Sequence, residues 1–286
     1  MSTPSSAYVD NTTRLALGLD LIDAAREMEL VYPVRVDVEY GLPHTPPIPA
    51  KVSHRFVQVR GKQPVALNRH TSGRYSLIYQ PSLKTEIDLR IYEYERRYVP
   101  RRLQAPLMTL EDVLTLEIVE PKDYYSGRVR QPVLFPGAAY PMLGKATGLV
   151  GRVLRDDEPM RWTHVEARME GGQLVGRTRG DDRGEFLLII DSLAASASDL
   201  SAEINITVTV FGPAVAPVPA TADLAAQDDL WDLPLEILPA IGAPDLISTG
   251  ETPPAGYVEG ASETIAFKVG RMLTGVEVDD FVFTPP

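Results

Sequence analysis

Along the N-terminal third of the chain, hydrophobic and polar residues alternate with the period of two that is typical of β-strands. Val34, Val36 and Val38 alternate with charged residues, so one face of this strand should be buried and the other should face water. The same alternation predicts further strands over residues 15–21, 56–60, 75–79, 86–92 and 98–103. Strands joined in this way by short loops favour an antiparallel β-sandwich.

Three segments interrupt this alternation. Residues 23–30 fit either a helical turn or a hairpin-like connection, and the prolines within residues 43–49 predict a loop. Within residues 104–146, the stretch 114–118 alternates and predicts one more strand. The prolines elsewhere in that segment predict a connector.

The same β signature occurs twice. Its first copy consists of Val34–Val38, His70–Leu77 and Ile87–Ile91, and its second of Val165–Met169, Asp181–Leu188 and Ile204–Val208. Self-similarity on this scale predicts two copies of one small β-sandwich. In the second copy, residues 186–189 are apolar on both alternating faces, so this strand should be covered on both sides.

Residues 148–212 resemble the carboxypeptidase regulatory-like (transthyretin-like) module. The resemblance rests on Gly148–Pro159, Trp162–Ala167 and Gly176–Phe186. The chain departs from the family at Asp156–Glu158, where an Asp-Gly pair often precedes the proline. The resemblance implies a β-sandwich without peptidase activity, since the module accompanies peptidases and lacks their metal ligands.

The predicted fold class is therefore all-β, with two small antiparallel sandwich domains of transthyretin- or immunoglobulin-like form and an extended C-terminal arm. We assign a sandwich to residues 1–104, a proline-rich connector to 105–146, a second sandwich to 147–212 and an arm with a late strand to 213–286. The arm holds two basic and twelve acidic residues, and so carries about −10 of the net charge of −11. Its ten prolines favour an extended chain over a continuous helix.

Composition bounds the class of protein. A chain this acidic, without a basic stripe, is not expected to bind nucleic acid. It has no apolar run of about 18 residues, so no insertion into a membrane is expected, and its N-terminus lacks the pattern of a signal peptide. The absence of cysteine excludes disulfides and thiolate sites and is typical of cytoplasmic assembly.

No motif indicates a catalytic chemistry. The four histidines are not in metal-ligand spacing, and the phosphate-binding loops and the nucleophile elbow are missing. Asp181, Asp182 and Glu185 lack the alternating oxygen ligands of a calcium loop and are better interpreted as a β-turn. We therefore predict no catalytic, cofactor-binding or metal-binding residue, and no enzyme.

Two groups of side chains are candidate partner interfaces. An arginine group surrounds Pro100, and its alternative interpretation is a solvated strand edge that discourages aggregation. Apolar residues in the acidic segment should either pack back on their own domains or dock on a neighbouring subunit. The interface residues that we predict are Arg96, Arg97, Arg101, Arg102, Trp231, Leu233, Leu235, Phe281 and Phe283.

The chain as a whole resembles accessory proteins of contractile phage tails and related injection systems. The stretches that carry this resemblance are Ser72–Tyr79, Ile87–Tyr92, Arg97–Leu103, Pro132–Pro141, Trp231–Glu236 and Asp280–Pro286. It implies a structural subunit near the cap end of the particle, whose partners are tail tube, sheath or terminator-type subunits and which forms a symmetric ring of copies. The alternative is a soluble protein- or glycan-binding module, for which twelve tyrosines are available but only two tryptophans.

Overall fold

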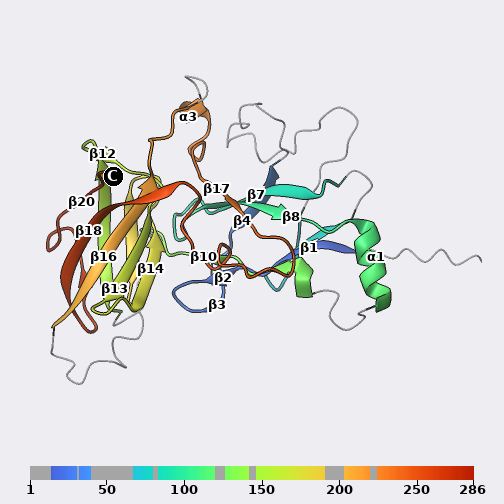
Figure 1. Cartoon of the computed structure of the whole chain (residues 1–286), viewed down its shortest axis with the longest axis horizontal. Coiled ribbons are helices and arrows are strands. Elements are labelled where there is room, and N and C mark those ends of the chain that lie inside the picture. Colours follow the sequence, from blue (N-terminus) through green and yellow to red (C-terminus); the bar gives the residue numbers. More distant parts are fainter. Residues whose placement is uncertain are drawn as a thin grey trace, which may run out of the picture.

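The computed structural model describes residues 14–30, 32–39, 67–79, 83–119, 126–141, 146–190, 203–219 and 224–286. Strands dominate this part of the chain, which confirms the all-β prediction. Buried side chains gather in two large hydrophobic clusters, one around Leu17 and Leu77 and the other around Phe186 and Val208. We refer to the strands around these cores as the first and second β units, which lie side by side with the second unit on the left in Figure 1.

The first unit contains the first ten strands. They are β1 (Leu15–Leu19), β2 (Ile22–Asp23), β3 (Met28–Glu29), β4 (Arg35–Glu39), β5 (Asn68–Arg69), β6 (Tyr75–Ile78), β7 (Glu86–Tyr92), β8 (Arg101–Pro106), β9 (Val129–Arg130) and β10 (Val133–Leu134). One sheet has the order β5-β6-β1-β9 and continues beside a small sheet, β10-β2-β3. Across the core lies β8-β7-β4, and β17 (Leu235–Ile237) pairs with the other edge of β8.

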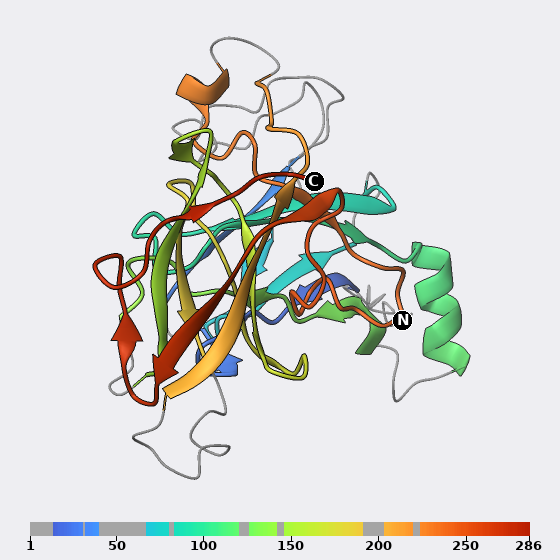
Figure 2. The ribbon, with the colours of Figure 1, turned by 60° about the vertical axis from the view of Figure 1, so that its left-hand side comes forward.

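The second unit contains most of the remaining strands. They are β11 (Gly148–Arg155), β12 (Glu158–Pro159), β13 (His164–Met169), β14 (Leu174–Arg179), β15 (Glu185–Ile189), β16 (Glu203–Pro213), β18 (Tyr257–Lys268), β19 (Met272–Leu273) and β20 (Phe281–Val282). One sheet has the order β12-β11-β15, with β19 and β20 paired along β11, and the other has the order β14-β13-β16-β18. The long, twisted pair β16 and β18 is at the front of Figure 2.

Several strands of the two units have equivalent pairings. The antiparallel neighbours β4, β7 and β8 of the first unit correspond to β13, β16 and β18 of the second. In the opposite sheet, β1 pairs with β6 as β11 pairs with β15, and the β2–β3 hairpin corresponds to β11–β12. The strands of the two predicted sequence copies, at β4, β6 and β7 and at β13, β15 and β16, therefore occupy equivalent positions.

The equivalence extends to the end of the chain. In the first unit, β9 and β10 pair in parallel with β1 and β2, and in the second, β19 and β20 pair in parallel with successive parts of β11. The sequence predicts an extended arm with a late strand in this part of the chain. Residues 257–282 instead form the closing strands of the second unit. The apolar side chains of this segment bury it against its own chain despite its acidic charge.

The chain crosses back to the first unit between β16 and β18. This crossing segment, residues 224–256, contains the short helix α3 (Leu224–Gln227) and the strand β17, which pairs in parallel with β8. Figure 1 shows it as the orange chain above and between the two units. One segment of the polypeptide therefore belongs to the surroundings of both cores.

The strand predicted over residues 114–118 is wrong, because these residues lie in the helix α1 (Leu110–Val119). Thr109 Oγ1 accepts a hydrogen bond from the backbone N–H of Asp112 at 3.1 Å, and the Asp112 carboxylate accepts one from the Thr109 hydroxyl at 2.6 Å. This reciprocal cap and the acidic first turn start a helix that the short alternation did not reveal. A short 3₁₀ helix (Ser126–Arg128) then leads into β9.

Other local expectations are refined. Residues 23–30 form a hairpin in which β2 and β3 flank a turn, and the strand predicted over 98–103 begins at Arg101. The strand predicted over 56–60, the loop at 43–49, His44 and His54 lie outside the described residues. The both-sided burial of β15 is confirmed, since Phe186 packs into the second core and Leu187 into the first.

Candidate functional site at the junction of the units

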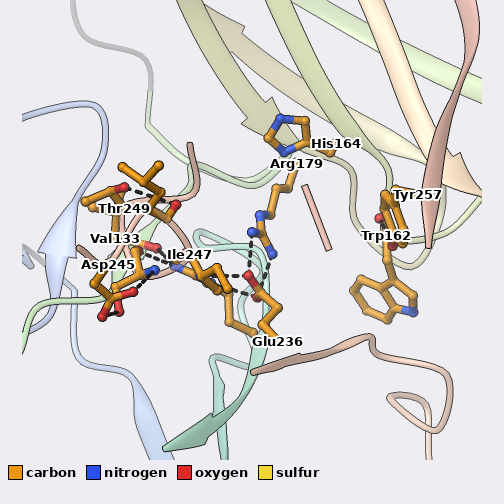
Figure 3. Close-up of polar contacts among 12 residues, drawn as sticks. Val133, Trp162, His164, Arg179, Glu236, Asp245, Ile247, Thr249 and Tyr257 are labelled. Carbon is orange, nitrogen blue, oxygen red and sulfur yellow. Dashed lines mark hydrogen bonds and ion pairs between the residues drawn. The ribbon is translucent and has the colours of Figure 1, made fainter. Parts of the chain in front are cut away.

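The junction is built around Glu236, a single carboxylate in the apolar strand β17. Its side chain is 1% exposed and lies between Arg101 from β8 of the first unit and Arg179 from β14 of the second. Each arginine donates two hydrogen bonds to it: Arg101 at 3.0 and 2.7 Å, and Arg179 at 2.7 and 2.6 Å. Figure 3 shows Glu236 beneath the guanidinium of Arg179. The three side chains form a buried ionic joint that connects both units through the crossing segment.

The electrostatics of this ionic joint favour the charged carboxylate. Burial by itself would raise the pKa of Glu236, but the charges and hydrogen bonds of Arg101 and Arg179 lower it to about 2. Arg101 also donates to the carbonyl oxygens of Val133, Ser248 and Ile247 at 2.6–2.7 Å, and so offsets part of its own desolvation. Burial lowers the pKa of Arg101, while the neighbouring carboxylate opposes this effect.

An apolar contact lies beside the ionic joint. Val99 of the first unit, Trp162 of the second and Leu233 of the crossing segment are buried together. The indole N–H of Trp162 donates to Asp232 at 2.8 Å, and the Tyr257 hydroxyl donates to the Trp162 carbonyl oxygen at 2.6 Å. Trp162 has a left-handed backbone conformation, with φ of +58°, which costs free energy that these contacts offset.

Further ion pairs hold the same junction. Arg96 of the first unit pairs with Asp182 in the turn before β15 of the second unit. Arg90 of β7 pairs at 2.8 Å with Asp228, a fully buried carboxylate at the end of α3. The crossing segment thus contacts both units by charge and by apolar packing.

The predicted interface residues are largely engaged within the chain. Arg96 pairs with Asp182, Arg97 with Glu93 and Glu95, Arg101 with Glu236, and Arg102 with Glu39. Leu233, Phe281 and Phe283 are buried in the chain's own cores, and Trp231 and Leu235 are half-buried in the crossing segment. The structure brings Arg101, Leu233 and Leu235 together at the junction and places Phe281 and Phe283 in the second core.

The sequence predicts a partner interface at Arg101 and does not predict the ionic joint, in which Arg101 is buried within its own chain. Arg101 was predicted as an interface residue, but neither Glu236 nor Arg179 was. A usable signal was present, because Glu236 is the one charge in the apolar run Leu233–Leu238. A lone carboxylate in such a strand indicates a buried partner of opposite charge.

His164 and Asp181 are engaged in local contacts of the second unit. His164 is fully buried, contacts Glu166 at 3.3 Å and has its pKa lowered by burial. Asp181 accepts hydrogen bonds from the backbone N–H groups of Arg183 and Glu185, which confirms the interpretation as a turn. Across the described ranges, no group of three or more His, Asp or Glu side chains is placed to hold a metal ion.

Two cavities accompany this arrangement. One, of about 280 Å³, lies in the first unit beside the turn before β6 and is lined by Asp20, Tyr32, Arg69, Ser72 and Tyr75 among others. The other, of about 300 Å³, lies between β2 and β10 of the first unit and β14 of the second. Both have mixed polar and apolar walls.

Comparison with known proteins adds no relative. No family model matches the chain, and no curated protein is similar to it. Among the helices within the described residues, none is long and apolar enough to cross a membrane.

Proposed function

We propose that this chain is a non-enzymatic structural subunit of a contractile tail-like injection particle, acting as an adaptor at the cap end of the tail. Its partners would be tube, sheath or terminator-type subunits, in a symmetric ring assembled in the cytoplasm. The sequence resemblance described above suggests the class of particle. The architecture supports the role of a connecting part.

The single observation that carries the proposal is the ionic joint. Arg101 and Arg179 share Glu236 out of contact with water, and the Trp162 cluster adds apolar packing beside it. Buried charged contacts of this kind hold one geometry, because any other arrangement leaves a charge unpaired. A chain whose two units are held in one orientation is suited to transmit position from one neighbouring subunit to the next.

The proposal is tested on the particle itself. Tail-like particles would be purified from the organism that encodes the chain, with and without the gene, and imaged by cryo-electron microscopy. We expect density for a ring of copies near one end, large subunit contacts, and shortened or uncapped tails when the gene is absent. Absence of the chain from intact purified particles would reject the proposal.

A second candidate is a soluble protein- or glycan-binding module. The cavity beside the turn before β6 favours it, because Tyr32 and Tyr75 line it together with Arg69 and Asp20. Aromatic faces beside charged hydrogen-bonding groups suit a polar ligand. A glycan array together with a pull-down decides between the candidates: specific glycan binding that R69A abolishes would favour this one, whereas recovery of tube or sheath subunits would favour the adaptor.

A further inference from the structure

The helix α1 carries an apolar ridge that remains exposed beside the part of the chain that the structure describes. Leu110, Leu114 and Ile118 follow one another at intervals of four residues and are 45%, 39% and 83% exposed. Among the side chains of this helix that the structure describes, Val113 alone is fully buried. Figure 1 shows α1 on the right, on the far side of the first unit from the second unit.

The composition of α1 indicates that it needs a second packing partner. Six of its ten residues are Leu, Ile or Val, and they lie on more than one side of the helix. A helix that is apolar on most sides is normally buried on most sides, and one this short gains its stability from packing rather than from propensity. The contact at Val113 accounts for one side of α1, and the ridge lies beside that contact and stays exposed.

We propose that this ridge is a docking surface for an amphipathic helix of a different protein, one with Lys or Arg beside its apolar stripe. The spacing selects a helix, because a row of side chains at intervals of four residues is the ridge that enters the groove of another helix. The charge selects basic flanks, because α1 has no basic residue and presents Glu111 next to the ridge. This inference is independent of the adaptor function.

Charge disfavours two other occupants. In a two-fold contact with a second copy, α1 would be brought against the same helix, which also has no basic residue. A lipid surface favours helices with Lys and Arg on the polar face, and anionic headgroups would repel the carboxylates of α1. Both occupants become outcomes of the test.

The test measures binding of three labelled synthetic peptides to the full chain by fluorescence anisotropy. One has a Leu stripe with Lys flanks, one has the same stripe with Glu flanks, and one has the composition of the first with the stripe scrambled. We expect binding of the first alone, with an affinity at least about tenfold weaker for L114E/I118E, because anchors at the centre of an interface dominate its energy. The control V276E changes an equally apolar side chain that is 96% exposed on a turn, and should bind as the unchanged chain does.

Each other result rejects the proposal. Equal binding of the scrambled peptide would show that the peptides bind through the net charge of the chain and not through the ridge. Equal binding of the Glu-flanked peptide would show that basic flanks do not contribute to recognition. Unchanged affinity in L114E/I118E would show that the peptide does not bind at the ridge. If sedimentation equilibrium showed self-association that I118E abolishes, the ridge would bind a second copy of the chain. If the chain bound phosphatidylserine vesicles and I118E abolished that binding, the ridge would bind a membrane. Circular dichroism confirms that the variants fold, which is expected for so exposed a position as Ile118.

Discussion

Glu236 holds its negative charge between two guanidinium groups at a place that water does not reach. The desolvation of three charged groups is costly, and the four short hydrogen bonds among them offset this cost only in the observed geometry. The contribution of the ionic joint to the unfolding free energy is therefore measured best by removing the charge of one of its three side chains. The lowered pKa of Glu236 makes the same contribution depend on pH.

Replacing Glu236 by glutamine should strongly destabilise the protein. E236Q leaves Arg101 and Arg179 without their counter-charge, and breaking a buried ion pair in this way typically costs about 3–5 kcal/mol of unfolding free energy. Urea denaturation measures the loss. The matched control is E251Q, since Glu251 is 3.7 Å from Arg177 with its side chain 43% exposed, and such pairs contribute about 0–1 kcal/mol. Equal effects of the two variants would contradict a buried, energetically coupled ionic joint.

The destabilisation in E236Q should fade in acid. The pKa of Glu236 is lowered to about 2, so its stabilising effect is fully present above its unfolded pKa and is lost as the pH falls toward the folded value. The difference in unfolding free energy between the unchanged chain and E236Q should be constant from about pH 6 to 8 and should narrow from about pH 4.5 to 2. A difference that stays constant down to pH 2 would show that the carboxylate is not the titrating group.

At the scale of elements, the alternation of residues did not predict the short strands and the helix α1. The alternation of residues predicted β4, β6 and β7 well. Strands β6 and β7 bury one face, and Val36 and Val38 of β4 pack half-buried against the same core. The alternation could not predict β9, β10, β19 and β20, which are two residues long and are strands only because β1, β2 and β11 pair with them. Pairing partners distant in sequence leave no periodic signal.

The strand β20 should contribute to the second core rather than act as a free end. Phe281 is fully buried with its ring centroid 5.7 Å from that of Phe186, so F281A should cost about 3–5 kcal/mol of unfolding free energy. Its neighbour Val282 is 63% exposed, and V282A should change stability by less than about 0.5 kcal/mol. Thermal and chemical denaturation measure both. A small effect of F281A would mean that the C-terminal strands detach from the core in solution.

The stabilising effect of the Thr109 cap should be measurable in the first turn of α1. T109A removes the hydroxyl that accepts from the Asp112 N–H and should cost about 1 kcal/mol of local stability. Amide hydrogen exchange of Asp112 and Val113, whose N–H groups both donate to Thr109, should speed up accordingly. T115A, on the same helix but with its hydroxyl donating to the Glu111 carbonyl oxygen, should leave these amides nearly unchanged. Equal exchange in both variants would reject the cap as the start signal.

At the scale of the whole molecule, the crossing segment joins two units with related strand pairings. If it couples their cores, the protein should unfold in one calorimetric transition, although it has two cores. L233A removes a buried side chain from the contact with Val99 and Trp162 and should split this transition into two. L246A, in the same segment but 49% exposed, should keep one transition. Two transitions in the unchanged chain would mean that the units unfold independently.

The sequence alone determined the all-β class of the fold and the both-sided burial of β15. Each of these depends on local alternation or on composition, and a core is formed wherever such alternation buries one face. Only the tertiary structure decided that the acidic C-terminal segment completes the second unit, and that Glu236 and Arg179 are the partners of Arg101. These outcomes depend on contacts between residues far apart in the chain, where free energy comes from pairing and desolvation that no local pattern records.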